Sequence, residues 1–124
     1  MLRSKLLSSD VRLKACEVQD SAHVKLGDKG NFVKLIQQAL VATDNAAIED
    51  AETGGGYYGR STAAAVLGYK TKRQIINRTY QNKPDDIVGR MTIKRLDDDM
   101  VEIESRDATK FFIAPLRNAC GRIY

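Results

Sequence analysis

The clearest helical pattern in the chain begins shortly after residue 30. Val33, Ile36 and Leu40 recur at intervals of three and four residues, which is the spacing of one buried helix face. The polar residues between them, Gln37 included, fall largely on the other faces. The pattern predicts a helix over residues 31–43.

A polar and acidic stretch follows this helix. Residues 44–52 include four acidic residues and no Lys or Arg, and residues 54–56 are three successive glycines. Glycine loses much backbone entropy in a helix and readily adopts positive φ, so three in succession are not expected to continue one. We therefore expect a loop over residues 44–56.

Two stretches that lie thirty residues apart share one sequence frame. Tyr58–Val66 and Val88–Leu96 both read apolar residue, Gly, Arg, any residue, Thr, three residues, apolar residue. Two copies at a fixed separation indicate an internal repeat. The Gly permits a sharp entry into a helix, and Thr in a first turn can bond free backbone N–H groups. We expect Gly59 and Gly89 each to precede a helix.

The second of these helices contains three consecutive aspartates, at residues 97–99. Negative charge is unfavourable near a helix C-terminus. We therefore expect this helix to run from residue 90 to about residue 100 and to end early.

The two ends of the chain are less clearly patterned. Residues 1–23 alternate apolar and charged positions in a way that fits either a short strand or a short helix. Residues 108–124 are apolar enough to dock on the core or on a neighbouring domain. We expect a lead-in over residues 1–23, one domain over residues 24–101, and a tail or linker over residues 102–124.

The composition is that of a single globular domain. Of the 124 residues, 43% are apolar and 29% are charged, which is enough for one core but not for two. No run approaches the roughly eighteen apolar residues of a membrane span, so we expect no membrane partner. The first ten residues lack the apolar region of a secretory signal. A signal was removed, or the chain begins inside a longer protein, or export uses another route.

The charge is unevenly distributed. The whole chain carries a formal net charge of +4, whereas residues 60–95 hold nine Lys and Arg against two Asp, a net charge of +7. Such a stretch either meets an anionic partner or forms an ordinary solvated face.

Cysteine and histidine are scarce. Cys16 and Cys120 either form a disulfide, which would contribute about 4 kcal/mol, or remain free thiols. Together with the single histidine, His23, they are too few for a structural zinc site. We expect neither a metal nor a cofactor.

Three motifs along the chain resemble those of the peptidoglycan-binding-domain-like family. The first is Gly27-x-x-Gly30-x-x-Val33-x-x-Ile36-Gln37-x-x-Leu40, which is similar to the family's opening helix, G-x-x-G-x-x-V-x-x-L-Q-x-x-L. The second, GYYGRSTAAAVLGYK from residue 56, is similar to D-G-x-F-G-x-x-T-x-x-A-V-x-x-F-Q. The third, DDIVGRMTIKRL from residue 85, is similar to D-G-I-V-G-P-K-T-W-x-A-L. The three stand in the family's order and cover residues 26 to about 100.

The resemblance implies both a fold and a function. The implied fold is all-α, a compact three-helix bundle with an internal pseudo-repeat, short extra helices or turns and irregular terminal extensions, with Tyr58 and Tyr69 at core positions. The implied function is non-catalytic binding of bacterial peptidoglycan in the periplasm or cell wall, which targets an attached or associated hydrolase or a secreted effector. The chain departs from the family at the proline after each motif glycine, which here is Arg60 or Arg90, and at the tryptophan, which is Ile93.

The chemistry of peptidoglycan suggests which residues would bind it. Its sugars, amides and carboxylates call for aromatic faces, amide or hydroxyl groups and guanidinium forks, and the middle of the chain has all three. Arg60 and Arg90 would stand at helix starts, where free N–H groups also favour anions. We predict that the ligand-binding residues are Tyr57, Arg60, Asn77, Tyr80, Gln81, Asn82 and Arg90.

The sequence favours a binding module over an enzyme. No catalytic residue is predicted, because the chain has a single histidine and neither a G-x-S-x-G nor an H-E-x-x-H frame. Two other readings stay open, a basic nucleic-acid-binding domain, which we do not favour, and a protein-docking module of a secretion machine. Phosphate binding would weaken steeply with added salt, whereas sugar and amide contacts would persist.

Overall fold

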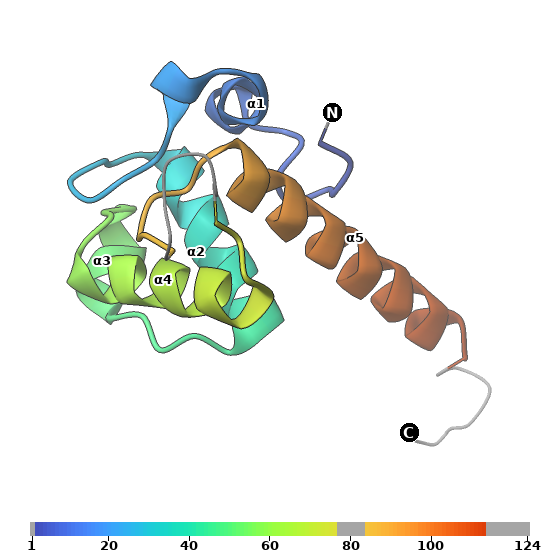
Figure 1. Ribbon diagram of the computed structural model, residues 1–124. Helices are drawn as coiled ribbons and strands as arrows, with labels where there is room; N and C mark the ends of the chain where they lie inside the picture. Colours follow the sequence, from blue (N-terminus) through green and yellow to red (C-terminus); the bar gives the residue numbers. More distant parts are fainter. Residues whose placement is uncertain (1, 77–83, 114–124) are drawn as a thin grey trace.

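The computed structural model describes residues 2–76 and 84–113, and over these residues the chain is built from helices and turns (Figure 1). The α-helices are α1 (Val11–Val18), α2 (Asn31–Asp44), α3 (Asp50–Gly55), α4 (Arg60–Arg73) and α5 (Arg90–Ile113). A 3₁₀-helix, η1 (Asp20–Ala22), follows α1. The described residues form no strand, only two isolated β-bridges, Val24–Val88 and Lys29–Tyr57. The all-α prediction is therefore confirmed.

Helix α2 is the element around which the others are arranged. Its predicted apolar face, Val33, Ile36 and Leu40, is buried, and it contacts α3, α4 and α5. It ends at Asp44, one residue later than predicted, and the next residue, Asn45, has the left-handed conformation that commonly closes a helix. The helix predicted over residues 31–43 is thus confirmed.

Helix α3 was not expected. Residues 50–55 are helical although two of them, Gly54 and Gly55, belong to the glycine run. Acidic residues in its first turn favour a helix N-terminus. The glycines fall in the last turn, and Gly56 closes the helix with a φ of +64°. The loop prediction was wrong for these residues because the glycines lie where a helix stops rather than inside it.

Both predicted glycine-led helix starts are confirmed. Gly59 directly precedes α4, and Gly89 directly precedes α5. Tyr58 and Tyr69, predicted as core residues, are fully buried.

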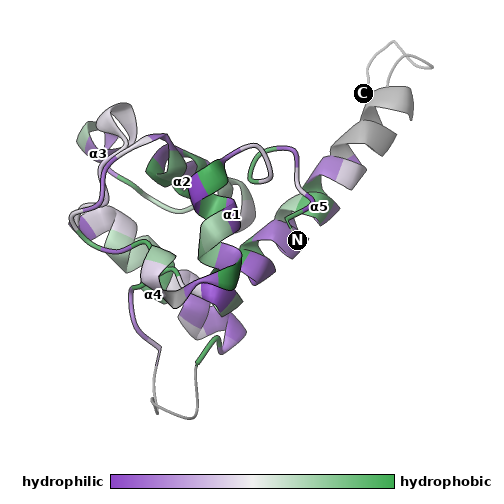
Figure 2. Ribbon diagram, turned by 90° about the horizontal axis from the view of Figure 1, so that it is seen from above, coloured by the Kyte–Doolittle hydropathy of each residue, from purple (hydrophilic) through white to green (hydrophobic). Residues whose placement is uncertain are grey.

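Helix α5 is much longer than predicted. It has 24 residues and continues through the three aspartates to Ile113, beyond the other helices (Figure 1). Apolar and polar positions alternate along it as bands (Figure 2). The expectation of an early end was wrong, because the three aspartates lie in the middle of the helix and have partners: Asp97 accepts hydrogen bonds from the N–H groups of residues 3 and 4, and Asp99 pairs with Arg73 and Arg95. None of the described helices combines the length and apolar composition that a membrane crossing needs.

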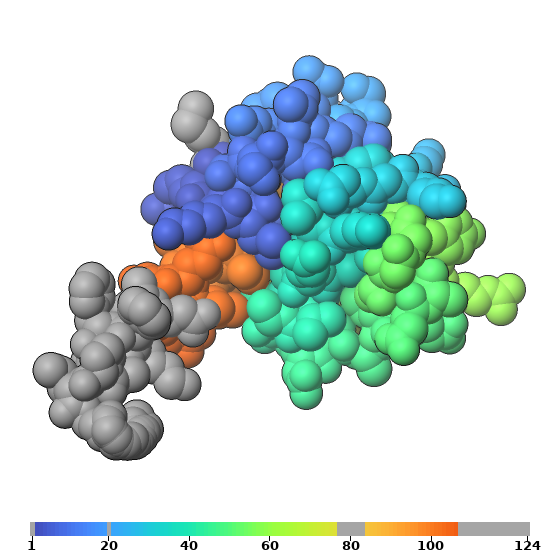
Figure 3. All heavy atoms as spheres, turned by 180° about the vertical axis from the view of Figure 1, so that it is seen from behind, coloured from blue at the N-terminus to red at the C-terminus, as the bar shows by residue number. Residues whose placement is uncertain are grey.

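The N-terminal segment lies against α5 (Figure 3), and backbone N–H groups of this segment hold it there. Asp97 accepts hydrogen bonds from the backbone N–H groups of Arg3 at 3.0 Å and Ser4 at 2.8 Å. Glu104 accepts two more, from Lys5 at 2.8 Å and Leu6 at 3.2 Å. These contacts join the first residues to a helix that lies more than ninety positions away in the sequence.

Asp97→Ala should destabilise the protein by about 2 kcal/mol, because it leaves two backbone N–H groups without an acceptor. Asp98→Ala is the matched control. Asp98 makes an exposed ion pair with Arg3 at 3.2 Å, and its loss should cost less than about 0.5 kcal/mol. Chemical denaturation measures both values, and amide exchange at Arg3 and Ser4 should accelerate only in Asp97→Ala. Equal losses of stability in the two variants would contradict this role of Asp97.

Candidate functional site

Two glycine turns from different motifs lie against each other. Residues 27–30 and 56–59, called here the turn pair, run antiparallel. The backbone N–H of Gly27 donates to the carbonyl of Tyr58 at 2.9 Å, and that of Tyr58 donates to Asp28 at 2.8 Å. The N–H of Gly30 donates to the carbonyl of Gly56 at 3.0 Å. The first two family-like motifs therefore meet at one place on the surface.

Glycine is required where the two turns approach most closely. Gly56 has a φ of +64°, and a Cβ there would lie 2.6 Å from the carbonyl oxygen of Gly30. Because that oxygen belongs to the backbone, it cannot move aside as a flexible side chain would. The close approach therefore depends on the absence of a side chain at residue 56.

Two predicted binding residues are exposed beside the turn pair. Tyr57 lies within it, bridged to Lys29, with 43% of its surface exposed. Arg60 follows as the exposed first residue of α4. Leu26, which directly precedes the first turn, and Lys29, which belongs to it, are exposed as well. Neither residue was predicted from the sequence, because only the pairing of the two turns brings residues 26–29 close to residues 57 and 58.

Gln37 supports the turn pair from below. Its side chain is 1% exposed, and its Nε2 donates to the carbonyl of Tyr57 at 2.9 Å and to Oγ1 of Thr62 at 3.0 Å. Its placement on a polar face of the helix was therefore wrong. The apolar period does not reveal this residue, because it is buried for its hydrogen bonds and not for its hydrophobicity.

Glu52 caps the start of α4 from the neighbouring helix α3. Its carboxylate accepts hydrogen bonds from the backbone N–H groups of Gly59 at 3.1 Å, Ser61 at 3.1 Å and Thr62 at 2.9 Å, and from the Thr62 hydroxyl at 2.7 Å. Burial raises the pKa of Glu52, but the hydrogen bonds from Ser61 and Thr62 outweigh it and lower the pKa to about 2. The carboxylate already occupies the N–H groups of Gly59, Ser61 and Thr62, so a bound anion would have to meet Arg60 itself.

Arg90 lies apart from the turn pair. It is the exposed first residue of α5 and lies two residues after Val88, whose backbone pairs with Val24. The start of α4 lies beside α3, whereas the start of α5 lies beside α1 (Figure 1). The structure thus brings Tyr57 and Arg60 together and leaves Arg90 at a different corner. The other predicted binding residues, Asn77, Tyr80, Gln81 and Asn82, lie outside the described residues.

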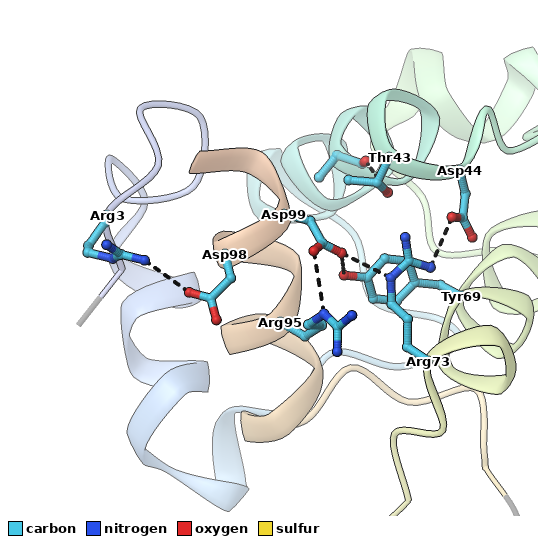
Figure 4. Close-up of polar contacts among 9 residues, drawn as sticks. Arg3, Thr43, Asp44, Tyr69, Arg73, Arg95, Asp98 and Asp99 are labelled. Carbon is cyan, nitrogen blue, oxygen red and sulfur yellow. Dashed lines mark hydrogen bonds and ion pairs between the residues drawn. The ribbon is translucent and has the colours of Figure 1, made fainter. Parts of the chain in front are cut away.

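Within the described part of the basic middle stretch, Lys70, Lys72, Arg73 and Arg95 pair with acidic side chains. Arg73 stacks on the Tyr69 ring, 3.8 Å from its centroid, and bridges Asp44 and Asp99 at 3.0 Å each (Figure 4). Burial and a hydrogen bond to Asp99 raise the pKa of Tyr69, so its phenol stays protonated. Other pairs are Lys70 with Asp85, Lys72 with Asp44, and Arg95 with Asp99. The net charge of +7 is therefore a weak argument for a polyanionic partner.

The cysteine prediction is tested at one end only. Cys16 is buried, and its Sγ lies 3.4 Å from the carbonyl oxygen of Val88. Burial raises the pKa of its thiol to about 11. Cys120 lies outside the described residues.

Among the side chains that the structure describes, those of residues 2–19, 21–76 and 84–106, no cluster of His, Cys, Asp and Glu could hold a metal ion. In comparisons with known proteins, no family model, curated protein or solved structure matches this chain. The resemblance of its three motifs therefore stays a prediction.

Proposed function

We propose that this protein binds bacterial peptidoglycan without catalysing a reaction on it. One observation carries the proposal. The pairing of the two glycine turns places an exposed aromatic side chain, Tyr57, near two exposed cationic ones, Lys29 and Arg60, on two hydrogen-bonded backbone segments.

These side chains suit the chemistry of the wall polymer. An exposed tyrosine ring offers an apolar face to sugar C–H groups, with a hydroxyl at its edge. An arginine fork recognises carboxylates of stem peptides, and a lysine adds a point charge. Because a carboxylate already caps α4, the guanidinium of Arg60 is the group left there to attract an anion.

The fold is consistent with a wall-binding module of the family that the motifs resemble. In this proposal, α2, α4 and α5 form its three-helix unit, and the glycine-led starts of α4 and α5 are its pseudo-repeat. The module would attach another protein to the cell wall. That protein would be an attached or associated hydrolase, or a secreted effector. The protein would then act in the periplasm or cell wall.

Co-sedimentation with purified sacculi tests the proposal directly. The protein should sediment with sacculi over a range of salt concentrations, and a soluble muropeptide should shift the NMR signals of residues 26–30 and 56–60. Absence of sedimentation at every salt concentration would refute the function. Sedimentation that vanishes steeply with salt would instead indicate a general polyanion site.

Tyr57→Ala and Arg60→Ala should each weaken binding to sacculi by about tenfold, equivalent to about 1.4 kcal/mol. Both side chains are exposed, so the melting temperature should stay close to that of the wild type. Leu67→Ala and Lys94→Ala are matched controls, since they remove exposed apolar and cationic side chains from α4 and α5. Equal losses of binding in all four variants would show that the turn pair is not the site.

A further inference from the structure

Three buried polar side chains, one from each of three helices, form a continuous hydrogen-bonded unit under the turn pair. Gln37 of α2 donates from Nε2 to Oγ1 of Thr62 on α4 at 3.0 Å. The Thr62 hydroxyl donates to Oε1 of Glu52 on α3 at 2.7 Å. All three side chains are more than nine-tenths buried.

This unit grips the backbone on both sides of the candidate binding residues. At one end, Gln37 donates to the carbonyl of Tyr57 at 2.9 Å. At the other, Glu52 accepts from the N–H groups of Gly59 and Ser61, which flank Arg60. The four-residue stretch from Tyr57 to Arg60 is therefore fixed at its two ends from inside the protein, while the two side chains point to solvent.

We propose that Gln37, Thr62 and Glu52 act as positioning residues that hold Tyr57 and Arg60 in a binding-ready arrangement. This inference rests on the proposed function of the turn pair. Binding groups are most effective when their backbone is held in place before the ligand arrives, because less conformational freedom is then lost on binding.

Stability alone does not explain an amide at residue 37. The Oε1 atom of Gln37 is buried and has no hydrogen-bond partner among the described residues, and such an acceptor costs free energy. A methionine of similar size would avoid that cost and would still fill the space. What methionine lacks is the N–H group that holds the carbonyl of Tyr57. The two roles of Gln37, packing and positioning, therefore predict different results for one substitution.

Gln37→Met is the main test. It should retain the wild-type melting temperature within about 3 °C. Its binding to sacculi should weaken by about three- to tenfold, and the NMR signals and amide exchange of residues 57–60 should change. Gln38→Met, on the exposed neighbouring position of the same helix, is the matched control and should match the wild type in all three measurements.

Thr62 provides a second test should Gln37→Met fold poorly. Thr62→Val removes the hydroxyl at constant shape and should weaken binding, whereas Thr62→Ser keeps the hydroxyl and should restore most of it. Thr92→Val changes the equivalent buried residue of α5 and should leave residues 57–60 unaffected. Wild-type signals for residues 57–60 in both Gln37→Met and Thr62→Val would overturn the positioning role.

The experiment separates this inference from the function on which it rests. If the wild-type protein does not sediment with sacculi, the proposed function fails. The NMR and amide-exchange measurements need no ligand, so they still decide whether the buried unit holds residues 57–60.

Discussion

Glu52→Ala is expected to lower the free energy of unfolding by about 3 kcal/mol, one of the two largest losses expected from a single substitution here. The carboxylate is the acceptor for three backbone N–H groups and one hydroxyl at the start of α4. Alanine would leave all of them unpaired in a buried place. Glu52→Gln keeps one acceptor oxygen but loses the charge, so its loss should be smaller, about 2 kcal/mol.

Urea denaturation at pH 7 measures these losses, and Glu49→Ala is the matched control. Glu49 precedes α3, and its exposed side chain makes no capping hydrogen bond, so its removal should cost less than about 0.5 kcal/mol. If Glu49→Ala proved as costly as Glu52→Ala, the capping role of Glu52 would be wrong.

The same carboxylate should make stability depend on pH. The pKa of Glu52 falls from 4.5 to about 2 on folding, so its contribution is fully present above about pH 5. As the pH falls from 5 towards 2, the unfolded state binds a proton that the folded state does not, and about 2–3 kcal/mol is lost. The gap in stability between the wild type and Glu52→Gln should therefore narrow over this range. A gap of constant size from pH 7 to pH 2.5 would show that folding does not lower the pKa of Glu52.

Gly56→Ala should destabilise the protein by about 2–4 kcal/mol. Part of this loss is the cost of placing an alanine at a φ of +64°, about 1 kcal/mol. The rest comes from the Cβ, which would lie 2.6 Å from the carbonyl oxygen of Gly30 and would force the turn pair apart. Peptidoglycan binding, if the turn pair is the site, should fall as well.

Another glycine of the same run, Gly54, provides the control for this substitution. Gly54 lies within α3, and a Cβ there would meet no atom within 4 Å. Gly54→Ala should leave stability unchanged or raise it by up to about 1 kcal/mol, because alanine is the better helix former. Differential scanning calorimetry on both variants distinguishes a specific contact at Gly56 from a general effect of losing a glycine.

The elements that the sequence predicted well are those whose signals are local. The apolar spacing of Val33, Ile36 and Leu40 predicted the buried face of α2. The predicted C-terminal end of this helix is also correct to within one residue. Gly59 and Gly89 mark the starts of α4 and α5 because glycine allows the sharp entry that each helix needs.

The elements that it missed depend on partners far away in the sequence. From the sequence alone, the acidic run in α5 indicates a helix end. In the structure, Asp97 of this run accepts hydrogen bonds from the backbone N–H groups of Arg3 and Ser4. From the sequence alone, Gln37 is expected at the surface. In the structure its side chain is buried and donates hydrogen bonds to Tyr57 and Thr62. Neither contact has a signature within a few residues of either partner.

The candidate site was predicted in part. Tyr57 and Arg60 are exposed beside the turn pair, as binding residues must be. Arg90 was grouped with them because it holds the same place in the repeated frame, but matching places in a repeat do not have to be near each other in space. Lys29 went unnoticed because only the pairing of the two turns brings it opposite Tyr57.

The attachment of residues 3–6 to α5 can form only late during synthesis of the chain. Residues 3–6 are synthesised long before the carboxylates that accept their N–H groups, which belong to residues 97 and 104. Contacts between such distant residues form late, because a long loop must close before they can be made. The N–H groups of residues 3–6 therefore lack their side-chain acceptors until residues 97 and 104 have been translated.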